Sequence, residues 1–269
     1  MGVWQEIGDR VWVRRYRYID QTIPAVGGAD GLLVVDTRSS SRQGSELRDD
    51  LRELGLPVRW VVNSHMHLDH TFGNASFAVE ETELWGHERC AAALRERGER
   101  WRMQTIAEDP ELADELRETS VVPPDHLTSD VATIDLGDRS VSLRFLGRGH
   151  TDNDLVLTVS DSPVVLAGDL LENGAPPYFG DGFPLDWPAT AEQILALAAG
   201  PVVPGHGDVG DPAFVERSID ELEEIARLGR AVGAGEMGLE EAIGRSPYGS
   251  VRSREPLERA AAQARGEVV

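Results

Sequence analysis

The chain has 269 residues, of which 41% are hydrophobic, enough for one large domain with a sizeable core. This composition excludes a disordered or collagen-like chain. The 47 acidic and 26 basic residues, all of the latter arginine, give a net charge of −21. A surface this acidic repels phosphate backbones, so we do not expect a nucleic-acid partner.

The beginning of the chain lacks the basic and apolar segments of a secretion signal. No window of about eighteen apolar residues occurs that would predict a membrane-spanning helix. The single cysteine, Cys90, excludes an internal disulfide, and it lies in a helical pattern where a buried apolar role is expected. These features predict a cytoplasmic protein without membrane contacts.

The first half of the chain alternates between strand and helix patterns, which is typical of α/β layering. Leu47, Leu51 and Leu54 share one face of a helical pattern that Gly55 ends. The predicted elements are strands at residues 11–18, 31–36, 58–63 and 84–86, and helices at 43–54, 88–97 and 99–119.

The second half begins with strand patterns and ends in helices. Gly137 and Asp138 mark a hairpin turn, and Asp211 followed by Pro212 is a strong helix start. The predicted elements are strands at 131–136, 141–146, 155–159, 164–167 and 202–203, a helix at 189–199, and two or three helices within 212–265.

We expect a single domain over residues 1–269, because no linker long enough to separate two domains occurs. It would carry a helical insertion at about 97–127 and C-terminal helices at about 212–265. Those C-terminal helices are expected to pack on the core, and a homodimer surface is an alternative role for them.

The segment Ser64–His70 contains three histidines and an aspartate directly after an apolar run. Imidazole and carboxylate together suit zinc and neighbouring first-row metals. Residues at i and i+2 on an extended loop point the same way, so His65 and His67 could share one metal. Asp69 and His70 lie slightly further along and could turn toward a second ion.

Three further segments combine glycine with a ligand-type side chain, namely those around His150, Asp169 and His206. Each follows an apolar, strand-like run. Side chains at strand ends can converge on one edge of a sheet, so these residues are candidates for the same metal site.

The ordered pattern H-x-H-x-D-H, Gly-His-Thr, Gly-Asp and Pro-Gly-His-Gly resembles the metallo-β-lactamase superfamily. The resemblance implies an α/β fold, an αββα sandwich with the metal site at one edge of its two sheets. The ligands that it implies are His65, His67 and His150 for a first metal, Asp69, His70 and His206 for a second, and Asp169 as a bridge between them.

The resemblance implies a binuclear zinc hydrolase that cleaves a small acyl substrate (a thioester, lactone or lactam) by attack of metal-bound hydroxide. Iron or manganese could replace zinc. Asp69 would be catalytic, by orienting the nucleophile and moving its proton. Many β-lactam-cleaving relatives have a cysteine or a non-bridging residue in place of Asp169, so the ligand set is closer to glyoxalase II-like thioesterases and lactonases. The alternative is a non-haem iron oxidoreductase of the persulfide dioxygenase type.

A loop rich in proline and aromatic residues, 176–184, follows Asp169 closely. Tyr178 could donate a hydrogen bond to a developing oxyanion. Phe183 is expected to line an apolar substrate pocket together with Phe179 and Trp187.

Other polar residues carry weaker expectations. Asp36 and Thr151 could orient metal ligands or serve only as turn or cap residues. Arg148 could bind a substrate anion, although an outward salt bridge is the expected role. His87 and His126 fit no ligand motif and are predicted to be non-catalytic.

Overall fold

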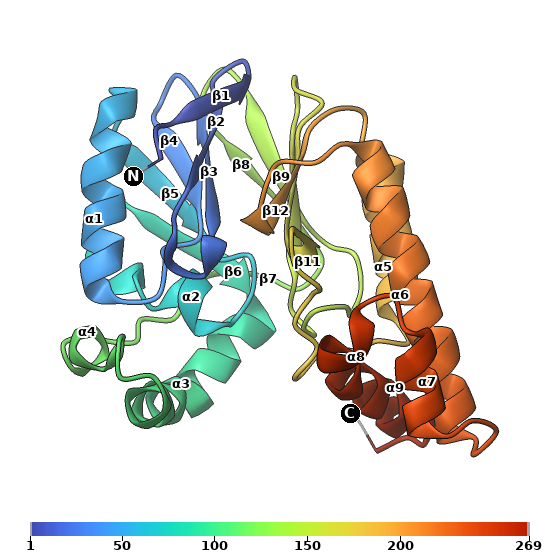
Figure 1. Ribbon diagram of the computed structural model, residues 1–269. Coiled ribbons are helices and arrows are strands. Elements are labelled where there is room, and N and C mark those ends of the chain that lie inside the picture. The colour runs from blue at the N-terminus through green and yellow to red at the C-terminus, as the bar shows by residue number, and fades with distance from the viewer. Residues whose placement is uncertain (1, 268–269) are drawn as a thin grey trace.

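A computed structural model describes residues 2–267 as two β-sheets packed face to face, with helices on both outer sides (Figure 1). The predicted αββα sandwich is therefore confirmed. The strand order is β1-β2-β3-β4-β5-β6-β7 in the first sheet and β12-β11-β10-β9-β8 in the second.

The first sheet is antiparallel from β1 to β4 and parallel from β4 to β7. Its parallel half carries the connections through helices that the sequence predicted. The strands are β1 (Gln5–Gly8), β2 (Val11–Arg15), β3 (Thr22–Gly27), β4 (Leu32–Val35), β5 (Val58–Val62), β6 (Glu83–His87) and β7 (His126–Thr128).

The second sheet is antiparallel except for its last pair, β11 and β12, which are parallel. That parallel pair requires a crossover, and helix α5 provides it. The strands are β8 (Val131–Asp135), β9 (Ser140–Phe145), β10 (Leu155–Val159), β11 (Val165–Asn173) and β12 (Val202–Gly207).

The two sheets bury one continuous apolar layer between them. Val35 and Val62 of the first sheet belong to the same buried cluster as Leu143, Leu157 and Val203 of the second. Val35 and Val62 are the last residues of β4 and β5, directly before Asp36 and the segment that carries His65 to His70. Their packing fixes the two sheets relative to each other, and with them the loops at the shared edge.

Helices cover the outer face of each sheet. In the first half, α1 (Ser41–Leu51) covers the sheet and α3 (Glu88–Glu108) contacts β6 and β7, while α2 (Leu68–Thr71) and α4 (Ala113–Arg117) pack against α3. The 3₁₀ turns are η1 (Tyr18–Asp20), η2 (Arg52–Leu54) and η3 (Asn74–Ser76). Ser40 caps α1 by accepting a hydrogen bond from Gln43 N at 3.1 Å. Leu47 and Leu51 of α1 are buried against the first sheet.

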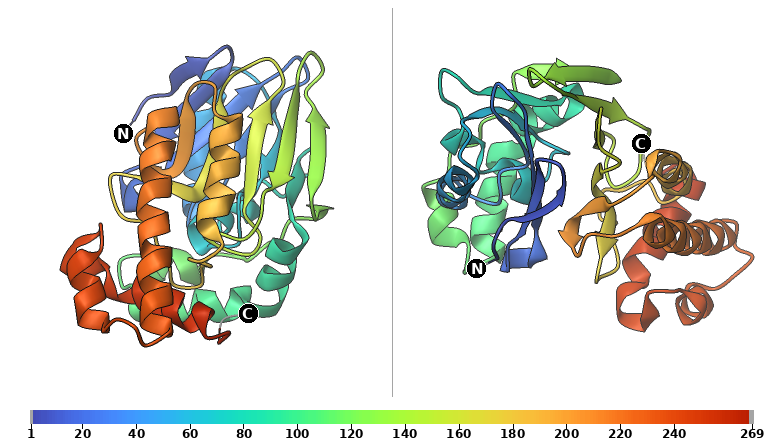
Figure 2. Two further views of the ribbon diagram at one scale, coloured as in Figure 1. Left: turned by 90° about the vertical axis from the view of Figure 1, so that its right-hand side faces the viewer. Right: turned by 90° about the horizontal axis from the view of Figure 1, so that it is seen from above.

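The second sheet is covered by α5 (Trp187–Leu197) and α6 (Pro212–Gly233), which lie side by side on it (Figure 2). Asp211 caps α6, as the sequence predicted, by accepting from Phe214 N at 2.8 Å. α7 (Leu239–Arg245) and α9 (Arg254–Ala264) pack against α6, and the short α8 (Gly249–Arg252) contacts α7 and α9. A dimer role for this helical region stays a prediction. None of the helices within residues 2–267 has the length and apolar character needed to cross a bilayer.

The region predicted as helices 88–97 and 99–119 differs from the expectation. α3 is one continuous helix from Glu88 to Glu108, and it passes through Gly98. A Cβ at Gly98 would lie 2.7 Å from Val121 Cγ1, so the glycine permits close packing rather than ending a helix. The expected insertion at 97–127 is only partly helical, since residues 118–125 are irregular before β7.

Several strand boundaries also differ from the expectation. β11 and β12 continue through Asp169 and His206, which were expected to follow strand ends. Register shifts flank Gly168 (φ +55°), so the strand continues while its side chains are redirected locally. β1, β3 and β7 were not predicted. β3 is buried along its whole length and contains Pro24, so it lacks an alternating pattern.

Candidate metal centre

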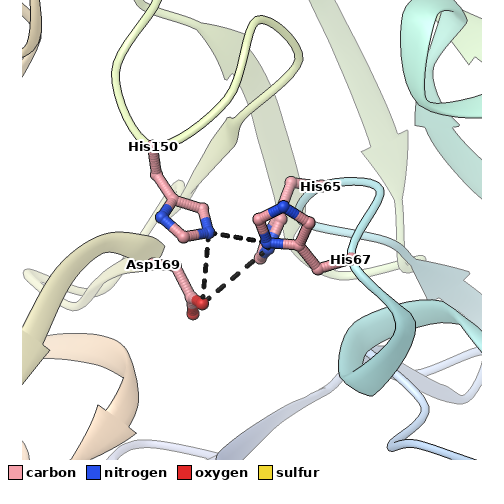
Figure 3. A group of neighbouring side chains, drawn as sticks. All are labelled: His65, His67, His150 and Asp169. Carbon is pink, nitrogen blue, oxygen red and sulfur yellow. Dashed lines mark hydrogen bonds and ion pairs between the residues drawn. The ribbon is translucent and has the colours of Figure 1, made fainter. Parts of the chain in front are cut away.

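The seven predicted ligand residues lie together at one edge of the two sheets. They form two groups of donor atoms, and within each group the atoms lie within 4.8 Å of one another. The first group is His65, His67, His150 and Asp169 (Figure 3), and the second is Asp69, His70, Asp169 and His206. Asp169 belongs to both groups.

In the first group, three imidazoles converge on one point. His67 Nδ1 lies 3.0 Å from His65 Nε2 and 2.8 Å from His150 Nε2. Asp169 Oδ2 lies 3.8 Å from His65 Nε2 and 3.5 Å from His150 Nε2. Ligands of one tetrahedral zinc are about 3.3 Å apart, so these separations suit such an ion.

In the second group, two imidazoles and two carboxylates converge. Asp69 Oδ2 lies 3.0 Å from His70 Nε2 and 3.2 Å from His206 Nε2. Asp169 Oδ2 lies 3.3 Å from each of the same two nitrogens. One oxygen of Asp169 therefore faces both groups, which is the arrangement of a bridging ligand.

The outer nitrogen of each of these five histidines has an oxygen partner, which fixes the orientation of the ring. The partners are Ser64 Oγ for His65 (3.0 Å), Asp181 for His67 (3.0 Å), Asp36 for His70 (2.8 Å), the Tyr178 carbonyl for His150 (3.1 Å) and the Ile19 carbonyl for His206 (2.7 Å). A carbonyl only accepts, so His150 and His206 must carry their proton on Nδ1 and leave Nε2 free for a metal.

Asp36 connects the end of β4 to the ligand loop. Its carboxylate accepts hydrogen bonds from Ser64 N (2.7 Å) and Ser64 Oγ (2.8 Å), besides that of His70 Nδ1. Its backbone has φ +68°, an unfavourable conformation that this network holds in place. Of its two expected roles, the structure therefore shows the ligand-orienting one.

Thr151, in contrast, has a turn role. Its N–H and hydroxyl donate to the two oxygens of Asp154 at 2.7 and 2.8 Å. Burial raises the pKa of Asp154 to about 7. Thr151 Oγ1 also accepts from Asn153 N at 3.1 Å, so a buried Ser/Thr-type turn closes the loop that carries His150.

The charges of the two groups are strongly coupled. Burial favours the neutral acid at Asp169, but His70, His206 and His65 outweigh burial and hold its pKa well below the usual range. Burial opposes the charge of His206, but Asp169 and Asp69 raise its pKa to about 11. Without a metal, protons on His70 and His206, whose pKa values are raised, compensate the buried carboxylates, whereas burial lowers the pKa of His65. A metal would take the place of those protons.

The donor set fits divalent cations. His70 Nε2 and Asp169 Oδ1 are buried and, among the described residues, form no hydrogen bond. A Cβ at Gly205 would lie 1.8 Å from Asp169 Oδ1, so only glycine leaves room for this carboxylate. Histidine nitrogens and carboxylate oxygens are ligands for zinc, and also for iron and manganese.

A cavity of about 690 Å³ opens beside the two donor groups. Of the predicted ligands, His67, Asp69, His150, Asp169 and His206 reach its wall. The other wall residues come from η1, α2, the end of α3, β11 with the loop after it, and β12: Ile19, Asp20, Leu68, Trp101, Gln104, Thr105, Glu108, Glu172, Asn173, Gly174, Ala175, Tyr178, Gly180, Asp181 and Gly207.

The prediction that Phe179, Phe183 and Trp187 line the substrate pocket is wrong, although Tyr178, the predicted oxyanion donor, does border the cavity. Phe183 is 5% exposed and packs beneath the guanidinium of Arg148, 4.4 Å from its ring centre. Phe179 and Trp187 are also buried, and the indole N–H of Trp187 donates to the Leu170 carbonyl at 3.0 Å. These rings support the loop from beneath and do not contact the cavity.

The remaining expectations concern Arg148, His87 and His126. Arg148 forms an ion pair with Asp186 at 2.6 Å, as expected for a structural role. His87 accepts from Arg89 N at 3.0 Å and caps α3. His126 contacts Asp125 on the surface and is not among the cavity residues.

Sequence reasoning missed Asp181 and the residues of α3 that border the cavity. Asp181 lies inside the loop that was singled out, but only its contact with His67 reveals a role. The α3 positions Trp101, Thr105 and Glu108 recur at helical spacing on one face, which was the available signal.

Comparisons with known proteins agree with this geometry. A family profile described as “Metallo-beta-lactamase superfamily” matches residues 25–232. The chain belongs to this superfamily. The match ends before α7, so the last three helices lie outside it.

Among similar proteins is a “Metallo-beta-lactamase type 2” from Bacteroides fragilis, 25% identical over 71% of this chain and 73% of that protein. Another of the same description, from Bacillus cereus, is 23% identical over 81% of each chain. A “Linear primary-alkylsulfatase” from Pseudomonas sp. is 23% identical over 74% of this chain but 43% of its own length.

The fold is also similar to solved structures. A metallo-β-lactamase from Pontibacter korlensis gives a TM-score of 0.67 at 20% identity, over 83% of this chain and 99% of that one. The FIM-1 metallo-β-lactamase from Pseudomonas aeruginosa, in a mono-zinc form, gives 0.65 at 16% identity, over 83% and 95%. At such identities the similarity concerns the fold alone.

The contact of Asp181 with His67 leads to a testable expectation. His67 directs its Nδ1 atom toward the other ligand atoms of its group, whereas the four other histidines direct Nε2 toward theirs. Although burial favours the neutral acid, the hydrogen bond to His67 lowers the pKa of Asp181 to about 2, so its carboxylate stays ionised. Removing it with Asp181→Ala should weaken metal binding at the first group about 10–100-fold.

A zinc titration against a competing chelator would measure this loss. Asp125→Ala is the matched control, because it removes a carboxylate from a surface histidine, His126, far along the chain from every ligand. Unchanged zinc affinity in Asp181→Ala, or equal losses in both variants, would contradict the role of Asp181.

Proposed function

We propose that the protein is a hydrolase that uses two divalent cations to cleave a small acyl substrate, and that zinc is the preferred cation. The observation that carries the proposal is the position of Asp169 Oδ2, within 3.3–3.8 Å of four histidines that belong to two donor groups. A site for one metal ion would need only one of the two donor groups.

Residues His65, His67 and His150 would hold one ion, Asp69, His70 and His206 the other, and Asp169 both. Two ions held in this way would lower the pKa of a water molecule and polarise the acyl carbonyl. The oxygen atoms that contact the outer nitrogen of each histidine keep the other nitrogen directed toward the metal position. The side chains therefore need little rearrangement when the ions bind.

Two side chains of the cavity wall have proposed roles in moving or donating protons. Asp69 borders the cavity as well as the second group, so its carboxylate can orient a water molecule and accept a proton from it. Burial, and then the charge of Asp181, raise the pKa of Tyr178. The phenol therefore keeps its proton near neutral pH and can donate to a developing oxyanion.

We propose a thioester or lactone as the substrate in preference to a β-lactam. The support is the carboxylate at position 169, which makes the ligand set similar to glyoxalase II-like enzymes. The relatives with β-lactamase in their names are at most 25% identical, and another relative is described as an alkylsulfatase, so similarity alone does not select a substrate.

A second candidate is a mononuclear iron oxidoreductase of the persulfide dioxygenase type. The first donor group favours it in one respect, since two of its three histidines and its carboxylate would supply the typical ligands of such iron centres. The complete second group favours the binuclear hydrolase, because a mononuclear enzyme has no use for Asp69, His70 and His206 in this arrangement.

Metal content is the direct test of the two candidates. Protein purified without added metal should contain about two zinc ions per chain by elemental analysis, since seven ligands form two groups. His206→Ala removes a ligand of the second group only and should lose mainly one ion. One iron per chain, with oxygen consumption on a persulfide, would establish the oxidoreductase instead.

The role of Asp69 is tested by Asp69→Asn. The amide can still contact a metal but cannot accept a proton, so hydrolysis should fall about 10²–10⁴-fold while most of the metal is retained. Rate and metal content are to be measured on the same sample, with Asp125→Asn as the control. Full activity of Asp69→Asn would exclude it as the proton acceptor.

The substrate class is tested with thioesters, lactones and chromogenic β-lactams compared side by side. We expect kcat/KM to be highest for a thioester or lactone, because the carboxylate at position 169 makes the ligand set similar to glyoxalase II-like enzymes. If a β-lactam gives the highest kcat/KM, the substrate assignment is wrong while the hydrolase assignment stands.

A further inference from the structure

The cavity wall beyond the donor groups is acidic. Among residues 2–267, the wall includes four carboxylates outside the donor groups and no arginine, and the chain has no lysine. The four carboxylates are Asp20, Glu108, Glu172 and Asp181. A substrate that enters this cavity passes or contacts these carboxylates as it approaches the metal ligands.

Two of the four carboxylates are already compensated. Asp20 forms an ion pair with Arg15, and Asp181 holds His67. The other two accept hydrogen bonds from neutral groups. Glu108 accepts from the Gln104 amide at 2.9 Å, and Glu172 accepts from Tyr178 N at 3.1 Å. Neither has an ion-pair partner within the part of the chain that the structure describes.

Arginines close to wall residues are engaged in other contacts. Arg15 binds Asp20 and Asp208 together. The guanidinium of Arg97 lies 4.9 Å from the ring centre of Trp101 and contacts Met66 Sδ at 3.9 Å. Arg259 acts on the pKa of Tyr178 and donates to the Gly182 carbonyl at 2.8 Å. None of the three belongs to the cavity wall. An anionic group on the substrate would therefore find no guanidinium partner in the wall, unless it displaced one of these contacts.

The wall also offers an aromatic face. The side chain of Tyr178 is among the exposed large apolar residues, at 53%, and it belongs to the loop that orients His150. Its ring lies over Gly180, where a Cβ would be 2.0 Å from the phenol oxygen. This ring lies 5.9 Å from the ring of His67, so it borders the reacting end of the cavity and leaves the remote end to Glu108 on α3.

From this wall we infer that the substrate of the proposed hydrolase carries a cationic group, such as a quaternary or protonated amine, at its end remote from the scissile bond. The inference rests on the proposed function and narrows its substrate class. The same wall discriminates against carboxylate, sulfate and phosphate groups at that end. The donor groups beside it, with the buried and unpartnered Asp169 Oδ1, mark the cavity as a ligand site independently of the acidic residues.

The expected preference follows from Coulomb's law. A unit charge about 6 Å from a carboxylate in a water-like medium changes affinity by a factor of about three, in opposite directions for the two signs. Cationic and anionic substrates should therefore differ about tenfold for the charge of Glu108, at an end far enough from the donor groups that solvent screens the charge of bound ions. Glu172 adds less, because burial and the charge of Asp169 raise its pKa to about 7. Salt should weaken the difference, since the cavity is open to solvent.

The experiment uses the zinc-loaded full chain and three acyl thioesters that end in trimethylammonium, tert-butyl or carboxylate groups. Two series carry the terminal group on the acyl or on the thiol side. In at least one series, kcat/KM should fall in that order, with a cation-to-anion ratio of about tenfold or more at low salt. If the carboxylate compound is equal or better in both series, the inference is wrong.

Glu108→Gln is the diagnostic variant, and Glu96→Gln is its matched control. Both residues lie on α3 and both changes remove one negative charge, but only Glu108 borders the cavity. Glu108→Gln should reduce the cation-to-anion ratio about tenfold, and Glu96→Gln should leave it unchanged. Equal effects of the two variants would mean that net charge, and not the cavity wall, sets the preference.

Calorimetry with the corresponding amides separates this inference from the proposed function. The amides resist hydrolysis, so their binding requires no turnover. If no thioester is cleaved but the cationic amide still binds best, the hydrolase proposal fails and the charge preference stands. If the cationic amide binds no better than the anionic one, the charge preference fails, whatever the rates of hydrolysis.

Discussion

The structure depends on the burial of one carboxylate oxygen among four imidazoles. Asp169 Oδ2 faces His65, His70, His150 and His206 at 3.3–3.8 Å. Moving such a group out of water is unfavourable unless hydrogen bonds or cations compensate it. The side chains that surround it come from both sheets, so the same charge requirement that would hold metal ions also ties the two halves of the sandwich together at this edge.

The groups that fix the orientation of those imidazoles come from several parts of the fold. Asp36 at the end of β4 fixes His70 and the backbone of Ser64, while the carbonyls of Ile19 and Tyr178 fix His206 and His150. Each partner belongs to a different element, so the site forms only when both sheets have packed. This explains why a strained backbone is retained at Asp36.

The substrate side of the site has a different origin from the metal side. α3 and the loop after β11 form much of the cavity wall, and the aromatic rings beneath that loop are buried. Wall residues such as Glu108 and Tyr178 contribute little to the core, so they could change charge and shape without disturbing the donor groups. The loop after β11 serves both sides, since Asp181 and the Tyr178 carbonyl also orient His67 and His150. α3, in contrast, contributes to the cavity wall alone.

The sequence by itself indicated α/β layering and clustered ligand-type side chains after strand-like runs, because spacing and periodicity are local properties. The αββα sandwich and the seven ligand roles followed from the resemblance of its ordered motifs to the metallo-β-lactamase superfamily. The sequence also identified Asp36 as a candidate for orienting ligands. The partner of His67, the buried position of Phe183 and the continuity of α3 through Gly98 were decided only by the tertiary structure. Each depends on which distant segment packs against the residue: Asp181 is 114 positions from His67, and Gly98 is small because Val121 lies against it. Local patterns contain no information about such contacts, and the sheets determine them when they close on their shared core.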